Sequence, residues 1–96
     1  MKINPQTVEK VRSQLDAALA GVEAYLESWF ISVQDFTTEV ELQIFAAKLR
    51  EMRASLDSGE PVPILGLWRI METWPYKNEI RQKIVEAELS YERVWK

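Results

Sequence analysis

The sequence predicts an all-α fold: a small helical bundle built on a long antiparallel helical hairpin, plus a short helix and a C-terminal helix. Apolar residues recur at spacings of three and four along most of the 96 residues, which is the period of one helix face. The three glycines and four prolines are confined to a few positions. No alternating apolar and polar run is long enough for a strand. A chain of this length predicts a single domain over residues 1–96.

The first predicted helix covers about residues 5–33. Asn4 is a favoured N-cap, and Pro5 suits the first helical position, where its missing N–H is not needed. Gly21 interrupts the helix at a cost of about 1 kcal/mol relative to alanine. Such a glycine is either merely tolerated or marks a close crossing by a second helix. The apolar face follows a heptad pattern: Val8, Val11, Leu15, Ala18, Val22, Tyr25 and Trp29.

The second predicted helix covers about residues 39–57. Thr38 and Glu41 form a capping-box pattern at its start, and Gly59 is a favoured stop signal. Two sustained heptad patterns favour antiparallel packing of the two helices. Because the first helix is the longer one, part of its apolar face would stay uncovered in a monomer, and we expect a homodimer to cover it. The second apolar face contains Leu42, Phe45, Leu49, Met52 and Leu56.

The remaining chain predicts an extended connection followed by two helices. Pro61 and Pro63 disfavour helical backbone in the residues before them. A short helix is expected at about residues 63–73, and a last helix at about residues 76–95, after Pro75 breaks the pattern. The apolar face of the last helix contains Ile80, Ile84, Ala87, Tyr91 and Trp95.

The composition argues against catalysis. The chain has no cysteine and no histidine, which excludes thiol nucleophiles, the commonest metal ligand and the imidazole base. Two glutamate pairs each share a helix face, Glu23 with Glu27 and Glu88 with Glu92. Their neighbours are polar or charged, so we interpret them as solvated surface groups rather than as a catalytic pair. We therefore expect no enzyme activity, no cofactor and no metal site.

The charge and hydropathy patterns bear on partners and location. A net charge of −3 argues against nucleic-acid binding, because phosphate contacts need a basic surface. The N-terminal segment leads into charged residues rather than into an apolar signal sequence. No apolar run approaches the length of a transmembrane helix. We therefore expect a cytoplasmic protein that binds neither nucleic acid nor membranes.

Four tryptophans are present, three of them in the second half of the chain. Such side chains either fill a core or anchor an interface. The stretch around Trp68 holds more apolar residues than a helix of three turns can bury. Trp95, the penultimate residue, either caps the core or contacts a partner. The candidate interaction surface predicted from this pattern contains Leu67, Trp68, Ile70, Met71, Trp74 and Trp95.

These patterns predict a small non-catalytic protein–protein interaction module of regulatory, adaptor or inhibitor type, resembling bacterial or phage accessory proteins in size and charge. Its acidic second helix offers a complementary surface to a basic partner through Glu39, Glu41, Glu51 and Asp57. The alternatives are a structural subunit of a homo-oligomer, and a small-molecule carrier with an aromatic pocket between helices. The sequence does not identify the partner.

Overall fold

The computed structural model describes residues 5–27, 36–63, 74–75 and 77–95. These residues form three helices, α1 (Pro5–Glu27), α3 (Glu39–Ser58) and α5 (Glu79–Val94), and the described ranges contain no strand. The predicted all-α bundle is confirmed. The predicted cap Asn4, the predicted part of the first helix beyond Glu27 and, apart from Pro63, the predicted helix at about 63–73 lie outside the described residues.

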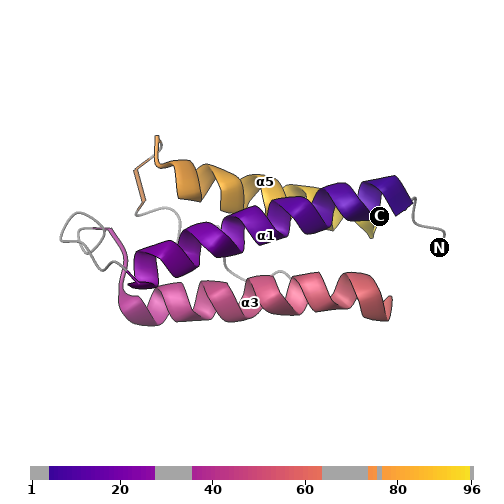
Figure 1. Ribbon diagram of the computed structural model, residues 1–96, viewed down its shortest axis with the longest axis horizontal. Coiled ribbons are helices and arrows are strands. Elements are labelled where there is room, and N and C mark those ends of the chain that lie inside the picture. The colour runs from indigo at the N-terminus through magenta and orange to yellow at the C-terminus, as the bar shows by residue number, and fades with distance from the viewer. Residues whose placement is uncertain (1–4, 28–35, 64–73, 76, 96) are drawn as a thin grey trace.

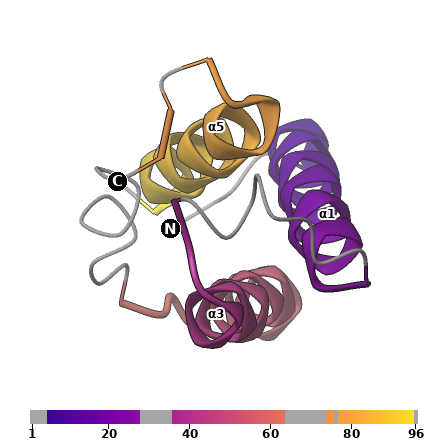
Figure 2. The same cartoon turned by 90° about the vertical axis from the view of Figure 1, so that its left-hand side faces the viewer.

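Helix α1 is the central element of the bundle. It runs antiparallel to α3 and to α5 (Figure 1), and it packs against both of them. Seen end on, the three helices stand at the corners of a triangle (Figure 2). The antiparallel hairpin predicted from the two heptad patterns is therefore present as α1 and α3, and the last helix covers it by packing on α1.

The apolar face of α1 is buried between the other two helices. Its fully buried members are Val11, Leu15, Ala18 and Val22. At Gly21 a Cβ atom would overlap the end of the Ile80 side chain on α5 and would lie 3.1 Å from Ile80 Cγ2. Of the two interpretations of this glycine, the close helix crossing is correct. The missing side chain lets α5 approach the backbone of α1.

Helix α3 begins and ends where the sequence predicts. The Thr38 hydroxyl accepts a hydrogen bond from the backbone N–H of Glu41 at 3.1 Å, which satisfies one of the free N–H groups of the first turn. Gly59 adopts a left-handed conformation with φ of 82°, and its N–H donates to the Ser55 carbonyl at 2.9 Å. The core face of the helix contains Leu42, Phe45, Ala46, Leu49 and Met52.

Helix α5 begins three residues later than predicted. The side chain of Asn78 accepts a hydrogen bond from the backbone N–H of Arg81 at 2.8 Å, and asparagine is among the best N-cap residues. This cap determines the start, so the predicted beginning near residue 76 is wrong. Asn78 also donates to the Tyr25 hydroxyl at 2.9 Å, which ties the start of α5 to α1. The buried face of α5 contains Ile84, Ala87, Tyr91 and Val94.

Ion pairs line one edge of the contact between α1 and α3. They are Asp16–Arg53, Glu23–Arg50 and Arg12–Asp57. Exposed pairs of this kind contribute roughly 0–1 kcal/mol each, so they help to set the alignment of the helices more than they stabilise them. In two of these pairs, the cationic side chains of Arg50 and Arg53 on α3 point towards α1.

Candidate functional site

The structure moves Trp74 from the predicted interaction surface into the core. Its side chain is 3% exposed. Its ring centroid lies 4.9 Å from that of Phe36 and 5.7 Å from that of Phe45, in edge-to-face geometry, and 6.2 Å from that of Tyr25. These neighbours come from α1, α3 and the residues before α3. Trp74 therefore fills one end of the bundle, and its assignment to an exposed surface is corrected.

The other members of the predicted surface are placed only in part. Trp95 is partly buried and packs against the core, with its ring centroid 6.1 Å from that of Tyr91 in edge-to-face geometry. It caps the far end of the core. Leu67, Trp68, Ile70 and Met71 lie outside the described residues. The described part of the chain therefore places no exposed tryptophan where a partner could bind.

A different apolar surface is exposed on α3. Val40 is 64% exposed and Ile44 is 50% exposed, and Ala47 is exposed as well. Their spacings of four and three residues place them on one face of the helix, opposite the core residues. We call Val40, Ile44 and Ala47 the outer stripe of α3. The sequence pattern did not indicate this stripe, because Val40, Ile44 and Ala47 lie outside the heptad positions of the second apolar face.

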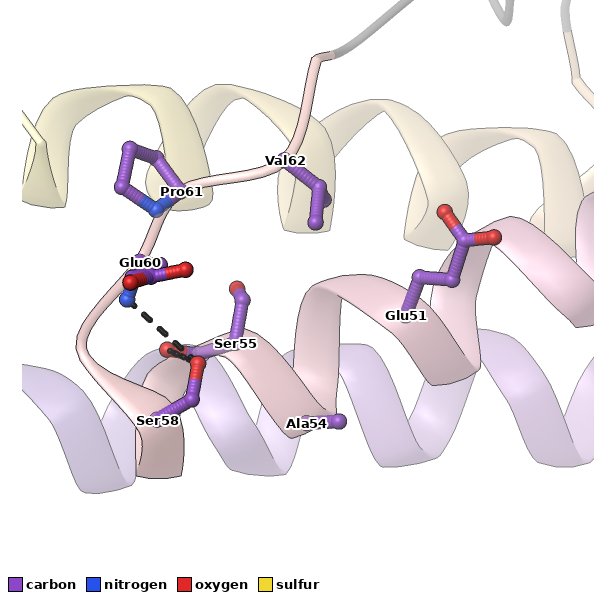
Figure 3. A pocket seen from close by; sticks show the side chains of 7 residues that line it. All are labelled: Glu51, Ala54, Ser55, Ser58, Glu60, Pro61 and Val62. Atoms are coloured by element: carbon purple, nitrogen blue, oxygen red, sulfur yellow. Dashed lines mark hydrogen bonds between the residues drawn. The ribbon is translucent and has the colours of Figure 1, made fainter.

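The same face of α3 continues into a pocket. Glu51, Ala54 and Ser58 follow the outer stripe at spacings of four, three and four residues. Together with Ser55 and the segment 60–62, they line a pocket of about 310 Å³ (Figure 3), which we call the α3 pocket. Its complete lining consists of Glu51, Ala54, Ser55, Ser58, Glu60, Pro61 and Val62.

Hydrogen bonds hold the wall of the α3 pocket in place. The backbone N–H of Val62 donates to the Tyr91 hydroxyl at 2.9 Å, and that hydroxyl lies 2.5 Å from Ser55 Oγ. Ser55 Oγ donates its one proton to the Met52 carbonyl at 2.7 Å. The Tyr91 hydroxyl must therefore donate to Ser55 and accept from Val62. The segment that follows α3 is thus fixed to both α3 and α5.

Carboxylates lie at both ends of the exposed face of α3. Glu39 and Glu41 are in its first turn, and Glu51 and Glu60 line the α3 pocket. Lys48 is 3.2 Å from Glu51, whereas the other two cations of α3 pair with α1. Among the described residues, Glu39, Glu41 and Glu60 form no ion pair. The exposed face therefore combines an apolar centre with acidic ends.

Glu88 departs from the predicted solvated state. Burial, and secondly the negative charge of Glu92, raise the pKa of the Glu88 carboxyl above its usual value. Its Oε2 atom is buried and has no hydrogen-bond partner among the described residues. Glu27 and Glu92, by contrast, are exposed as predicted.

The described residues contain no group of three His, Cys, Asp or Glu side chains suited to hold a metal ion. Nor is any helix in those ranges long and apolar enough to cross a membrane. Comparison of the chain with known protein families, curated proteins and solved structures gave no match. Among the described residues, the exposed face of α3 is therefore the feature that best indicates a function.

Proposed function

We propose that this protein is a small non-catalytic protein–protein interaction module, and that its partner binds the outer stripe of α3. One observation carries the proposal: Val40 and Ile44 are at least half exposed and lie one turn apart on the same face. Single exposed apolar side chains are ordinary, whereas contiguous ones flanked by polar residues are typical of interaction sites. Full burial of such a side chain is worth roughly 1.5–3 kcal/mol, which a partner would supply.

The homo-oligomer alternative has less support from the described residues. A homodimer was expected because part of the apolar face of the first helix seemed uncovered. Within the described part of α1, that face is buried between α3 and α5, from Val11 to Val22. A single chain therefore covers this part of the face, whereas Trp29 of the predicted face lies outside the described residues.

The carrier alternative is also weakly supported. The α3 pocket has a volume of about 310 Å³, at the lower end of the roughly 300–1,000 Å³ of small-molecule sites. Its lining contains no aromatic residue, although an aromatic pocket was the reason for considering a carrier. A pocket of this size suits one side chain of a protein partner better.

The proposal is tested by comparing three forms of the protein as bait in an extract of the cells that make it. The forms are the wild type, the double variant Val40→Asp/Ile44→Asp and the control Leu89→Asp. Leu89 lies on α5 and is 47% exposed, close to the 50% of Ile44. Because all three positions are exposed, we expect the helical circular dichroism to stay unchanged. The wild type and the Leu89 variant should retain the same protein, and the double variant should lose it. Retention by the double variant would contradict the proposal.

A further inference from the structure

We infer that the partner is an amphipathic helix with basic flanks, which lies along α3 from Val40 to the α3 pocket and places a lysine or arginine side chain in that pocket. The inference rests on the proposed function and names the chemistry of the partner. It combines three observations: the length of the exposed face of α3, the charges at its two ends and the lining of the pocket.

The exposed face has the length and shape that a helix needs. From Val40 to Ser58 it extends about 27 Å, or about five turns. A partner helix would contact it through residues spaced at three and four, as in other cases of helix recognition by an apolar surface. Ala47 and Ala54 are exposed on this face, and their small side chains let a second helix approach closely.

The charges favour a basic partner over a second copy of this chain. Glu39 and Glu41 lie in the first turn of α3, on either side of Val40. Glu51, which is paired with Lys48, and Glu60 lie towards the other end of the face. In an antiparallel pair of α3 helices, the acidic start of one would meet the acidic end of the other. In a parallel pair, each carboxylate would meet its own copy. Like charges placed together oppose association, whereas lysines or arginines on a partner would complement both ends.

The α3 pocket suits a long side chain with a cationic end. Ala54, Pro61 and Val62 provide apolar walls against which an aliphatic stem can pack. Glu51 and Glu60 lie at opposite ends of the lining in the view of Figure 3. The Glu60 carboxylate forms no ion pair among the described residues, so it would accept charge-assisted hydrogen bonds from an ammonium or guanidinium group. Glu51 would share its carboxylate between that group and Lys48. A purely apolar side chain would form no such bond, and an acidic side chain would meet two carboxylates.

Synthetic peptides test the inference on the full chain. Three peptides of about 18 residues are used: one with a leucine stripe and lysine flanks, one with the same stripe and glutamate flanks, and one with the lysine composition in scrambled order. Each is titrated into the ¹⁵N-labelled protein. The lysine-flanked peptide should shift the amide signals of Ile44, Ala47, Ala54 and Val62. The other two peptides should bind at least about tenfold more weakly, because charge and pattern are both required.

A variant pair tests the role of the pocket. The double variant Glu51→Gln/Glu60→Gln should weaken binding of the lysine-flanked peptide about fivefold or more. The control Glu86→Gln, an exposed position on α5, should bind like the wild type. Loss of binding in the pocket variant alone supports the inference.

Four results would overturn the inference: no shift with the lysine-flanked peptide, equal binding of the glutamate-flanked peptide, equal binding of the scrambled peptide, or wild-type binding of the lysine-flanked peptide by the Glu51→Gln/Glu60→Gln variant. None of them affects the capture experiment with the Val40 and Ile44 variants. The proposed interaction surface can therefore survive a failure of the proposed partner chemistry. If the Val40→Asp/Ile44→Asp variant still captures the partner, the proposed interaction surface and the proposed partner chemistry are both contradicted.

Discussion

The hydroxyl of Tyr91 lies 2.5 Å from Oγ of Ser55, which joins α5 to α3, the two helices that both pack on α1. The same hydroxyl accepts the N–H of Val62, so one oxygen atom connects two helices and the segment that walls the α3 pocket. Because this oxygen is both donor and acceptor, the structure of the pocket depends on a single buried group.

Replacement of Tyr91 by phenylalanine should therefore destabilise the protein by about 1–3 kcal/mol, because it leaves the Val62 N–H without its acceptor and removes the hydrogen bond to Ser55 Oγ. Urea denaturation followed by circular dichroism measures this change. Tyr25→Phe serves as a control, since it removes one partly buried bond to Asn78 and should cost less. A Tyr91→Phe variant as stable as the wild type would show that the hydroxyl does not hold this junction.

The crossing of α1 and α5 predicts coupling between Gly21 and Ile80. Alanine in a helix is about 1 kcal/mol more favourable than glycine, but at Gly21 its Cβ would overlap Ile80. Gly21→Ala should therefore stabilise the Ile80→Ala protein. In the wild type, the same substitution should stabilise the protein by less or should destabilise it. Urea denaturation of the four proteins gives the coupling, which should be about 1 kcal/mol. An equal gain in the free energy of unfolding in the wild-type and Ile80→Ala backgrounds would contradict the close approach of Ile80 to Gly21.

Trp74 should behave as a core residue. Trp74→Ala should lower the free energy of unfolding by about 3–5 kcal/mol, as large-to-small changes in a core do. In a small domain, such a loss is a large fraction of the total stability. Thermal denaturation by circular dichroism is the measurement, with Leu89→Ala as an exposed control. A Trp74 variant that unfolds at the wild-type temperature would show that this residue does not contribute to the core.

Ionisation of the Glu88 carboxyl should lower the free energy of unfolding as the pH rises. Because its pKa is raised in the folded state, the folded protein binds this proton more tightly than the unfolded chain does. Stability is therefore lost as the pH rises from the usual glutamate pKa of 4.5 through the raised value, and the loss is absent below that range. Glu88→Gln should be more stable than the wild type at about pH 7, with the difference shrinking at about pH 4. Urea denaturation at the two values measures it. The exposed control Glu86→Gln should show little difference at either, and an equal response of the two variants would contradict the account.

The elements that sequence reasoning predicted correctly are those with local causes. The buried faces of α1 and α3 follow from helical periodicity, and the cap at Thr38 and the stop at Gly59 follow from the conformations of single residues. The start of α5 was harder, because Pro75 and Asn78 are both start signals and only the hydrogen bond to Arg81 distinguishes them.

The site depends on contacts that sequence patterns do not contain. Trp74 is buried because Tyr25, Phe36 and Phe45 converge on it from three separate segments. The exposure of Ile44 depends on which side of α3 the other two helices occupy. The α3 pocket needs Tyr91, distant in the sequence, to hold Val62. Each of these is a tertiary relationship.

The most direct test of the central claim is site-specific photo-crosslinking in the cells that make the protein. A photoreactive amino acid is placed at position 44 in one form and at position 89 in another, because Ile44 and Leu89 are similarly exposed on different helices. If the outer stripe of α3 is the interaction surface, position 44 should yield a discrete adduct with another protein and position 89 should not. An adduct from position 89 alone, or none from position 44 in cells that make the protein, would contradict the account.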